Sequence, residues 1–369
     1  MKVLVTGAAG FIGRNLLLRL TEAGHTALPV VRATSDAELA EMVSQADVVI
    51  HLAGANRPDS EAEFDEINDQ YTARLCELLR IQGKPVPVIA ASSIQVDRDN
   101  PYGRTKRAAE AHLCALAEET GTPVNICRLV NVFGKWCRPN YNSVVATFCH
   151  NIARDLPITI NDPTALLRLV HVDDVIDSWL AWVAAPAGGL RITSVEPEYH
   201  VTLQDLADQL RSYRAIRQTH TVGQTGAGFG RALYATYISY LPIEDFAYPV
   251  TRHSDARGVF AEMLRTEQSG QFSFFTAGPG ITRGGHYHHA KTEKFLVLKG
   301  HARFRFFNMD SGETHALEIR GDESMIVETV PGWSHDITNI GADELICMLW
   351  ANELFDQERP DTFAWPLVD

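Results

Sequence analysis

The chain has 369 residues, of which 45% are hydrophobic and 21% are charged. This ordinary globular composition excludes a disordered chain, collagen and a coiled coil, and no apolar run approaches the roughly 20 residues of a membrane helix. With 33 basic against 46 acidic residues, the net charge of −13 argues against nucleic-acid binding through a broad basic face. We find no pattern typical of a signal peptide and no CxxC pair, so we expect a cytoplasmic protein with reduced thiols.

Residues 1–244 alternate short apolar runs with amphipathic helical patterns. The runs KVLVTG, DVVIHLAG, VPVIAASS and VNICRLVNVFG are typical of strands that are buried on both faces. This alternation of strands and helices predicts an α/β Rossmann-type doubly wound parallel sheet.

A glycine-rich turn follows the first predicted strand and opens the first helix. Glycine permits a tight turn and a close backbone approach to a pyrophosphate, which the helix N-terminus then faces. The sequence therefore predicts a dinucleotide site formed by the residues of this turn, Gly7, Gly10, Phe11, Ile12 and Gly13.

The second predicted strand, about residues 25–31, ends at Arg32. An acidic residue at this place would bind the ribose 2′-hydroxyl of NAD, whereas an arginine suits the 2′-phosphate of NADPH. Arg32 thus favours NADPH, and the alternative is a solvated loop arginine.

Tyr102 and Lys106 are spaced four residues apart near the start of a predicted helix, so their side chains share one face. An ammonium group near a phenol lowers the phenol pKa, which brings the group within range of proton transfer. Ser93, at the end of the run VPVIAASS, is placed to hydrogen-bond a substrate oxygen.

These features resemble the extended short-chain dehydrogenase/reductase family. Its usual landmarks also occur in order as HLAG at 51–54, Asn68, RLVNVFG at 128–134 and VHVDD at 170–174. The resemblance implies that Ser93, Tyr102 and Lys106 form the catalytic set, with Asn68 as a member of a proton relay. The family places its catalytic hydroxyl last in the serine run, which favours Ser93, and Ser92 remains the alternative. The gap of eight residues between Ser93 and Tyr102 is shorter than in other extended members.

The same resemblance implies further contacts with small molecules. The cofactor would also touch Leu52, Ala53 and Gly54, besides Tyr102 and Lys106. A UDP-sugar substrate would be held by residues after the later strands, for which the candidates are Asn131, Lys135 and Arg138. Packing explains these last three equally well.

The pattern changes near residue 250. The stretch 223–230 (GQTGAGFG) has the composition of a flexible loop, and residues 241–250, with two prolines, are the candidate linker. After it, short runs rich in phenylalanine and valine are separated by turn residues, which predicts an all-β sandwich or barrel. We therefore predict two domains, residues 1–244 and 249–369.

A metal site is predicted in the second domain. Side chains two apart on a strand share a face, so His286 and His288 point the same way. Glu293 follows closely, and His335 comes from a later segment. Three imidazoles and a carboxylate suit Zn²⁺ or another first-row divalent metal.

These residues resemble the cupin superfamily, whose first motif is matched from Gly280 to Gly300 and whose second motif is matched in part around His335, with the proline one place early at Pro331. Residues 255–262 and 280–286 also resemble 3,5-epimerases of deoxy-sugar 4-uloses, which use a histidine base and no metal. The family's basic histidine would be His286, so the two resemblances give this residue different roles.

Taken together, the resemblances of the first domain to a reductase and of the second to a cupin and to 3,5-epimerases imply a bifunctional enzyme. A 4-keto nucleotide sugar would be epimerised at C3 in the cupin domain and then reduced at C4 by hydride from NADPH in the first domain, and the enzyme would be a homodimer. The alternative is an NAD-dependent nucleotide-sugar 4-epimerase or dehydratase whose cupin is a non-catalytic dimerisation module.

Overall fold

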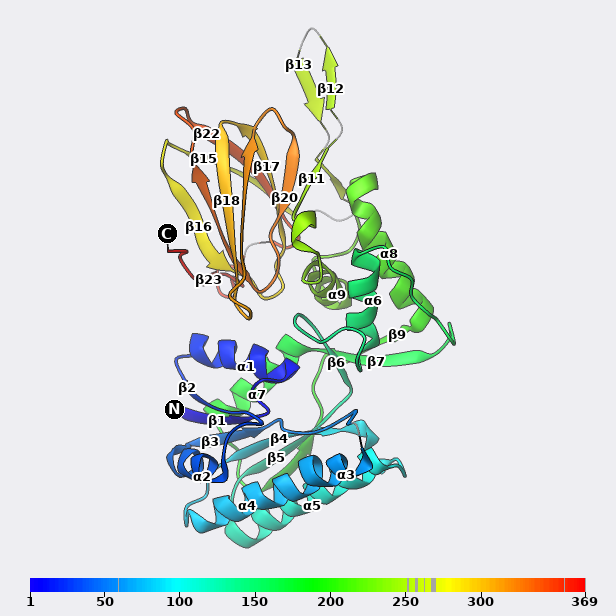
Figure 1. The fold of residues 1–369 in the computed structure, drawn as a ribbon, viewed down its shortest axis with the longest axis vertical. Helices are drawn as coiled ribbons and strands as arrows, with labels where there is room; N and C mark the ends of the chain where they lie inside the picture. The colour runs from blue at the N-terminus through cyan, green and yellow to red at the C-terminus, as the bar shows by residue number, and fades with distance from the viewer. Residues whose placement is uncertain are drawn as a thin grey trace. The chain divides into compact units, whose positions relative to one another are not determined.

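The computed structural model describes residues 1–58, 60–250, 252–255, 258–261, 263–266, 270–354 and 356–368. Its contacts divide the chain into two compact units (Figure 1). Unit 1 comprises Met1–Phe133 and Leu167–Val201, and unit 2 comprises Gly134–Leu166 and Thr202–Asp369. The boundary between residues 244 and 249 follows the change in sequence pattern and stays a prediction.

Unit 1 contains a six-stranded parallel sheet in the order β2-β1-β3-β4-β5-β8. Its strands are β1 (Lys2–Thr6), β2 (Thr26–Val30), β3 (Val48–His51), β4 (Val88–Ser93), β5 (Val124–Leu129) and β8 (Leu190–Thr193). Helices α1 (Phe11–Glu22) and α7 (Val172–Ala184) cover one face, while α2 (Asp36–Gln45), α4 (Tyr71–Ile81) and α5 (Pro101–Thr120) cover the other (Figure 1). The predicted doubly wound α/β sheet is confirmed.

The apolar runs form strands because both faces of the sheet are buried. Side chains alternate along a strand, so Val3 and Val5 pack into the core beneath α1 and α7, whereas Leu4 between them packs into the opposite core. All three side chains are fully buried.

Unit 1 also contains shorter elements around the carboxyl ends of the strands. They are α3 (Glu61–Phe64), a π-helical turn η1 (Asp65–Gln70), a 3₁₀ turn η2 (Ile94–Asp97), and a small sheet of β6 (Asn131–Phe133), β7 (Leu166–His171) and β9 (Tyr199–Thr202).

Unit 2 contains two five-stranded antiparallel sheets. The first has the order β11 (Ala247–Pro249), β20 (Met325–Glu328), β17 (Glu293–Lys299), β22 (Leu345–Ala351) and β15 (Gln271–Ala277). The second has the order β19 (Thr314–Arg320), β18 (His301–Asn308), β21 (Trp333–Asn339), β16 (Thr282–Tyr287) and β23 (Phe363–Ala364). The rings of Phe295 and Phe304, one from each sheet, lie 6.0 Å apart between them. The predicted all-β cupin-type barrel is confirmed.

The remaining elements of unit 2 are helices and short strands. They are α6 (Val144–Ala153), α8 (Leu203–Thr219), α9 (Gly228–Ile238), a 3₁₀ turn η3 (Ile243–Asp245), a parallel pair of β10 (Thr221–Val222) and β14 (Arg265–Thr266), and an antiparallel pair of β12 (Arg252–Asp255) and β13 (Gly258–Ala261). Among the described residues, no helix combines the length and apolarity needed to cross a membrane.

A buried group of charges joins the helices of unit 2 to the barrel. Lys294 of β17 is paired with Glu328 of β20 and also donates to the Tyr248 hydroxyl at 3.1 Å. Arg217 of α8 binds the second oxygen of Glu328 at 3.1 Å. Because burying a charge is costly unless it is paired, these contacts must form together.

Two segments differ from their expected form. Residues 241–250, the candidate linker, include strand β11, which pairs with β20. The glycine-rich stretch 223–230 is closely packed, since a Cβ on Gly226 would lie 2.6 Å from the carbonyl oxygen of Asn352. The composition of both segments suggested flexible connections, but both are held by contacts with other parts of unit 2.

Two candidate active sites

The glycine-rich turn lies between β1 and α1, where the strand order reverses because β1 has β2 on one side and β3 on the other. Ligands of open α/β sheets bind at such a point, beyond the carboxyl ends of the strands. Gly7 has a φ of 66°, and a Cβ there would lie 2.8 Å from the backbone nitrogen of Ala53. A Cβ on Gly13 would lie 2.5 Å from the Gly7 carbonyl oxygen. Both positions therefore require glycine.

The turn after β3 is held beside the glycine-rich turn by Thr6. Its hydroxyl oxygen accepts the backbone N–H groups of Leu52 and Ala53, each at 3.1 Å, and lies 2.7 Å from Nδ1 of His51. The predicted contacts Leu52 and Ala53 thus adjoin the turn. The sequence reasoning assigned no role to Thr6, which belongs to no motif, or to His51, which it noted only as the first residue of HLAG.

The residues of the turn fit the pyrophosphate of a dinucleotide. Gly10 is the N-cap of α1, Phe11 and Ile12 open the helix, and its first turn carries no acidic residue. Without a competing carboxylate, the helix N-terminus is favourable for an anionic group.

Arg32 lies just after β2 and is exposed. The nearest carboxylate along the chain, Asp36, is paired with Arg74 at 2.5 Å. Arg32 is therefore accessible to a phosphate at the end of β2, the position from which we predicted recognition of NADPH.

The structure brings Ser93 and Tyr102 together. Ser93 ends β4, Tyr102 lies in the first turn of α5, and the two side chains lie close enough for Ser93 to influence the phenol. Burial raises the pKa of Tyr102, against a smaller lowering by Ser93. The expected lowering by Lys106 is therefore wrong for this chain, because burial dominates. A raised pKa keeps the phenol protonated at neutral pH, as a proton donor requires.

Ser92 has a different environment. Its hydroxyl donates to Glu110 at 2.5 Å, and the same carboxylate binds Arg128 through both oxygens. Since Ser92 is engaged in this buried group, the geometry favours Ser93 for substrate contact.

Lys106 lies one turn beyond Tyr102 in α5. Its amine donates to the Ala91 carbonyl at 3.2 Å, and burial lowers its pKa to about 8. A Cβ on Gly54 would lie 3.0 Å from this amine and 3.1 Å from Oδ1 of Asn68. Lys106, Gly54 and Asn68 thus adjoin one another, with Asn68 held on the π-helical turn by two bonds to the backbone of Ala55. This clustering supports the predicted relay.

The three candidate substrate contacts have little in common. Asn131 is exposed at the start of β6 in unit 1. In unit 2, Lys135 is buried with its amine 5.4 Å from the Trp136 ring centroid, and the Arg138 guanidinium lies 5.2 Å from that of Tyr141. As substrate contacts, Asn131, Lys135 and Arg138 stay predictions.

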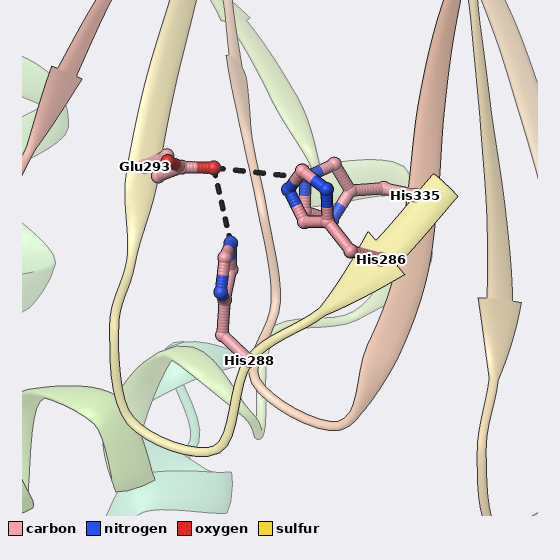
Figure 2. Close-up of side chains that lie close together, drawn as sticks. All are labelled: His286, His288, Glu293 and His335. Atoms are coloured by element: carbon pink, nitrogen blue, oxygen red, sulfur yellow. Dashed lines mark hydrogen bonds and ion pairs between the residues drawn. The ribbon is translucent and has the colours of Figure 1, made fainter. Parts of the chain in front are cut away.

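In unit 2 the four predicted metal ligands meet between the sheets of the barrel. His286 is on β16, His288 follows that strand, Glu293 opens β17, and His335 is on β21 (Figure 2). One ligand atom from each lies within 4.8 Å of the others. His286 and His335 are direct partners in the ladder, where the register shifts by a bulge after Gly284.

The donor set fits a divalent cation. Nδ1 of His288 is 2.6 Å from the Asp361 carbonyl oxygen, so Nδ1 donates there and Nε2 is the ring nitrogen turned toward the cluster. That Nε2 is hydrogen-bonded to a carboxylate oxygen of Glu293 at 3.1 Å, and Nε2 of His335 lies 3.6 Å from the same oxygen. A proton or a cation between these atoms is what makes such distances favourable. His335 is 2% exposed, and neither ring nitrogen meets the geometry of a hydrogen bond.

The electrostatics keep these groups ready to bind a metal. Burial, reinforced by His335 and His288, lowers the pKa of His286 to about 3, and burial also lowers that of His335. Burial acts to raise the pKa of Glu293, but His288 and His335 outweigh it and hold the pKa well below its usual value. Metals bind neutral imidazoles and ionised carboxylates, so the lowered pKa values of His286, His335 and Glu293 all favour the forms that bind.

The epimerase-like segments can be placed only in part. Residues 280–286 lead into and form most of β16, which carries His286. In 255–262, residues 256, 257 and 262 lie outside the described residues.

Comparison with known proteins gives matches in both parts of the chain. Residues 3–194 match the NAD dependent epimerase/dehydratase family, and residues 253–363 match the polysaccharide biosynthesis C-terminal domain. Over 365 residues the chain is 53% identical to UDP-2-acetamido-2,6-beta-L-arabino-hexul-4-ose reductase of Pseudomonas aeruginosa, covering 99% of this chain and 98% of the relative.

Two further matches extend this picture. The crystal structure of the capsular polysaccharide assembling protein CapF from Staphylococcus aureus is similar over 100% of both chains, with 39% identity and a TM-score of 0.69. The spore coat polysaccharide biosynthesis protein SpsL of Bacillus subtilis is 28% identical over 128 residues, which cover 32% of this chain and 85% of that protein.

Proposed function

Because the chain belongs to the NAD dependent epimerase/dehydratase family, we propose that it is a bifunctional nucleotide-sugar enzyme that uses a nicotinamide cofactor. Its substrate is UDP-2-acetamido-2,6-dideoxy-β-L-arabino-hexos-4-ulose, in keeping with the name of the Pseudomonas aeruginosa relative. The residue 249–369 domain epimerises C3, and the residue 1–244 domain then reduces the C4 ketone. The product is UDP-2-acetamido-2,6-dideoxy-L-talose, a UDP-N-acetyl-L-fucosamine precursor for capsular polysaccharide or O-antigen.

The observation that carries the reductase assignment is the closeness of Ser93 to Tyr102, whose phenol pKa the Ser93 side chain lowers. A hydroxyl and a protonated phenol at the end of a strand can both reach one carbonyl oxygen of a substrate. The glycine-rich turn follows β1, and Ser93 ends β4 of the same sheet. Unit 1 therefore supplies both the cofactor site and the proton donor.

The reductase residues act on the C4 oxygen. NADPH, when bound, supplies the hydride that adds to C4, and the carbonyl electron pair moves to oxygen. The Ser93 hydroxyl binds that oxygen, and the Tyr102 phenol donates the proton that completes the alcohol. The Lys106 amine, one turn beyond Tyr102 in α5, supplies positive charge to the site.

In the barrel, His286, His288, Glu293 and His335 would hold a divalent metal, for which three imidazoles and one carboxylate favour Zn²⁺. A bound metal supplies Lewis acidity to the C4 oxygen, which acidifies the C3–H bond. Epimerisation then removes the C3 proton from one face and returns a proton to the other.

His286 has a second candidate role. Of the four clustered residues it alone is partly exposed, whereas the other three are buried. A histidine that is open to a substrate is suited to act as the base that the 3,5-epimerase resemblance implies.

Three finer features complete the proposal. The exposed Arg32 supports NADPH rather than NAD. The buried imidazoles support zinc. The enzyme acts as a homodimer, as the family resemblance implies.

A second candidate function is that of an NAD-dependent 4-epimerase with a non-catalytic barrel. It is favoured by a 25% match over 250 residues to UDP-glucose 4-epimerase of Vibrio cholerae, which covers 56% of this chain. Such an enzyme returns its hydride to the sugar and consumes no cofactor overall.

The test is to incubate the enzyme with the UDP-4-keto sugar and NADPH in D₂O and to examine the product by NMR. We expect one NADPH oxidised per alcohol formed, together with deuterium at C3. Tyr102→Phe should stop NADPH oxidation and leave C3 exchange in place. Product formation without net NADPH consumption would favour the 4-epimerase.

A further inference from the structure

We propose that Asp361, in the C-terminal segment of the chain, is the positioning residue of the metal centre. This inference rests on the proposed metal site. Asp361 lies outside the four-residue cluster and belongs to neither cupin motif, and 67 residues separate it from Glu293. Its contacts nevertheless converge on the turn that joins two of the ligands, His288 and Glu293.

The backbone carbonyl of Asp361 orients His288. It accepts a hydrogen bond from Nδ1–H at 2.6 Å, which turns Nε2 toward Glu293. The His288 carbonyl is held separately by the N–H of Gly332 at 2.9 Å. Ring rotation of His288 would break the bond to Asp361, so this one contact determines both the tautomer and the direction of the ligand nitrogen.

The carboxylate of Asp361 holds the turn itself. Oδ1 accepts the N–H of His289 at 2.9 Å, and Oδ2 accepts those of Ala290 and Lys291 at 2.9 and 2.7 Å. Three consecutive N–H groups thus end on one side chain. Because these residues connect His288 to Glu293, their positions set the separation of the two ligands.

Asp361 is itself held in an uncommon conformation. Its φ is 39°, in the left-handed region, and its side chain is 12% exposed. Arg231 of α9 contacts Oδ2 at 3.3 Å and is also paired with Glu353. Next to Asp361, strand β23 pairs with β16 so that Ala364 lies opposite His286. Arg231 and strand β23 thus fix the position of Asp361, which in turn fixes the positions of the groups bonded to it.

The arrangement points to a specific use of the C-terminal segment. The barrel strands alone place His286 and His335 as neighbours, but His288 lies beyond the end of β16 and has no ladder partner of its own there. Asp361 supplies the missing constraint. Its loss should therefore weaken metal binding more than it weakens the fold.

The experiment compares the full-length enzyme with Asp361→Asn, using Zn²⁺ affinity from chelator competition and the absorption spectrum of the Co²⁺-loaded protein. Asparagine tolerates a positive φ but replaces one acceptor oxygen by a donor, so it isolates the lost hydrogen bonds. We expect Zn²⁺ affinity to fall about 10- to 100-fold, the usual effect of disturbing an outer partner of a metal ligand. C3 exchange should return at saturating Zn²⁺.

Asp356→Asn is the matched control. Asp356 lies in the same segment and accepts the N–H groups of Glu358 and Arg359, but it is exposed and its contacts do not reach the metal-binding turn. It should leave Zn²⁺ affinity unchanged. Unchanged Zn²⁺ affinity in Asp361→Asn would overturn the proposal, and a wild-type enzyme that binds no divalent metal would instead overturn the metal site itself.

If Asp361→Asn does not fold, a third variant, Arg231→Gln, tests the same role. Arg231→Gln leaves Asp361 in place and removes its charged neighbour, so we expect a several-fold loss of Zn²⁺ affinity with a retained fold by circular dichroism. If Arg231→Gln binds Zn²⁺ as the wild type does, the positioning role is refuted.

Discussion

Ser93 lies beside the Tyr102 phenol and lowers its pKa, while the neighbouring Ser92 donates to Glu110 on the same helix as Tyr102. The two serines thus lie against different residues of one helix. One contact involves the proposed proton donor, and the other holds β4 to α5.

This difference predicts opposite effects for two alanine variants. Ser93→Ala should lower kcat/KM for NADPH-dependent reduction about 100-fold, as expected for a lost hydrogen bond to developing negative charge, with little change in stability. Ser92→Ala should lower the free energy of unfolding by about 1–3 kcal/mol, because Glu110 loses a buried partner. Steady-state kinetics and urea unfolding measure both. The reverse pattern would make Ser92 the catalytic serine.

The pH dependence of reduction should follow Lys106. Because its pKa is lowered to about 8, the amine is charged below pH 8 and loses its charge as the pH rises through that value. We expect kcat/KM to fall above about pH 8 in the wild type. In Lys106→Arg the charge persists, so the residual activity should show no fall there. A wild-type profile that stays flat to pH 10 would contradict the role of the charge.

Cofactor choice should depend on Arg32. Arg32→Ala is expected to raise KM for NADPH about 10-fold or more, because a hydrogen bond to a charged group contributes about 1.5–3 kcal/mol. KM for NADH should change little, which makes NADH the internal control. Arg80→Ala removes a half-buried arginine that pairs with Glu119 and should affect neither. Equal effects on both cofactors would refute recognition of the 2′-phosphate.

Acid should destabilise unit 1 through His51. Burial lowers the pKa of this histidine to about 3, so the folded chain keeps it neutral while the unfolded chain protonates it below about pH 6.5. Stability is therefore lost as the pH falls from 6.5 toward 3, by about 2 kcal/mol at pH 5. Urea unfolding at pH 7.5 and 5 should show this loss, and His51→Gln should show less of it. An identical loss in the variant would assign it to other groups.

Metal removal should separate the two reactions. A strong chelator is expected to stop C3 deuterium exchange and to leave NADPH binding intact, because the two sites lie in different units. His286→Asn then decides between the roles of His286. Loss of bound metal would identify a ligand, and loss of exchange with full metal content would identify the base. Exchange that survives both treatments would refute a catalytic barrel.

The sequence predicted those parts of the two sites whose residues lie close together along the chain. Tyr102 and Lys106 share one helix, and His286 on β16 and His288 just beyond its end both reach the same cluster. The sequence could not reveal contacts made through register. The pairing of His286 with His335 depends on the bulge after Gly284, and Asp361 reaches His288 from far along the chain. No periodicity or motif encodes such contacts.

The sequence also could not show how deeply individual side chains are buried. The spacing of Tyr102 and Lys106 suggested a lowered phenol pKa, but the packing of α5 raises it. The two prolines of 241–250 suggested an open connection, but Tyr248 is buried beside Lys294.

The buried charges of unit 2 have a consequence for dissecting the protein. A fragment that starts at residue 249 would keep Lys294 and Glu328 but lose Tyr248 and Arg217, which complete their bonding. Removing α8 would take away Arg217 and expose Glu328 to water, so the pair of Lys294 and Glu328 would lose its protein cover. A fragment that keeps this bonding must therefore include Arg217 and Tyr248, and so must begin before α8.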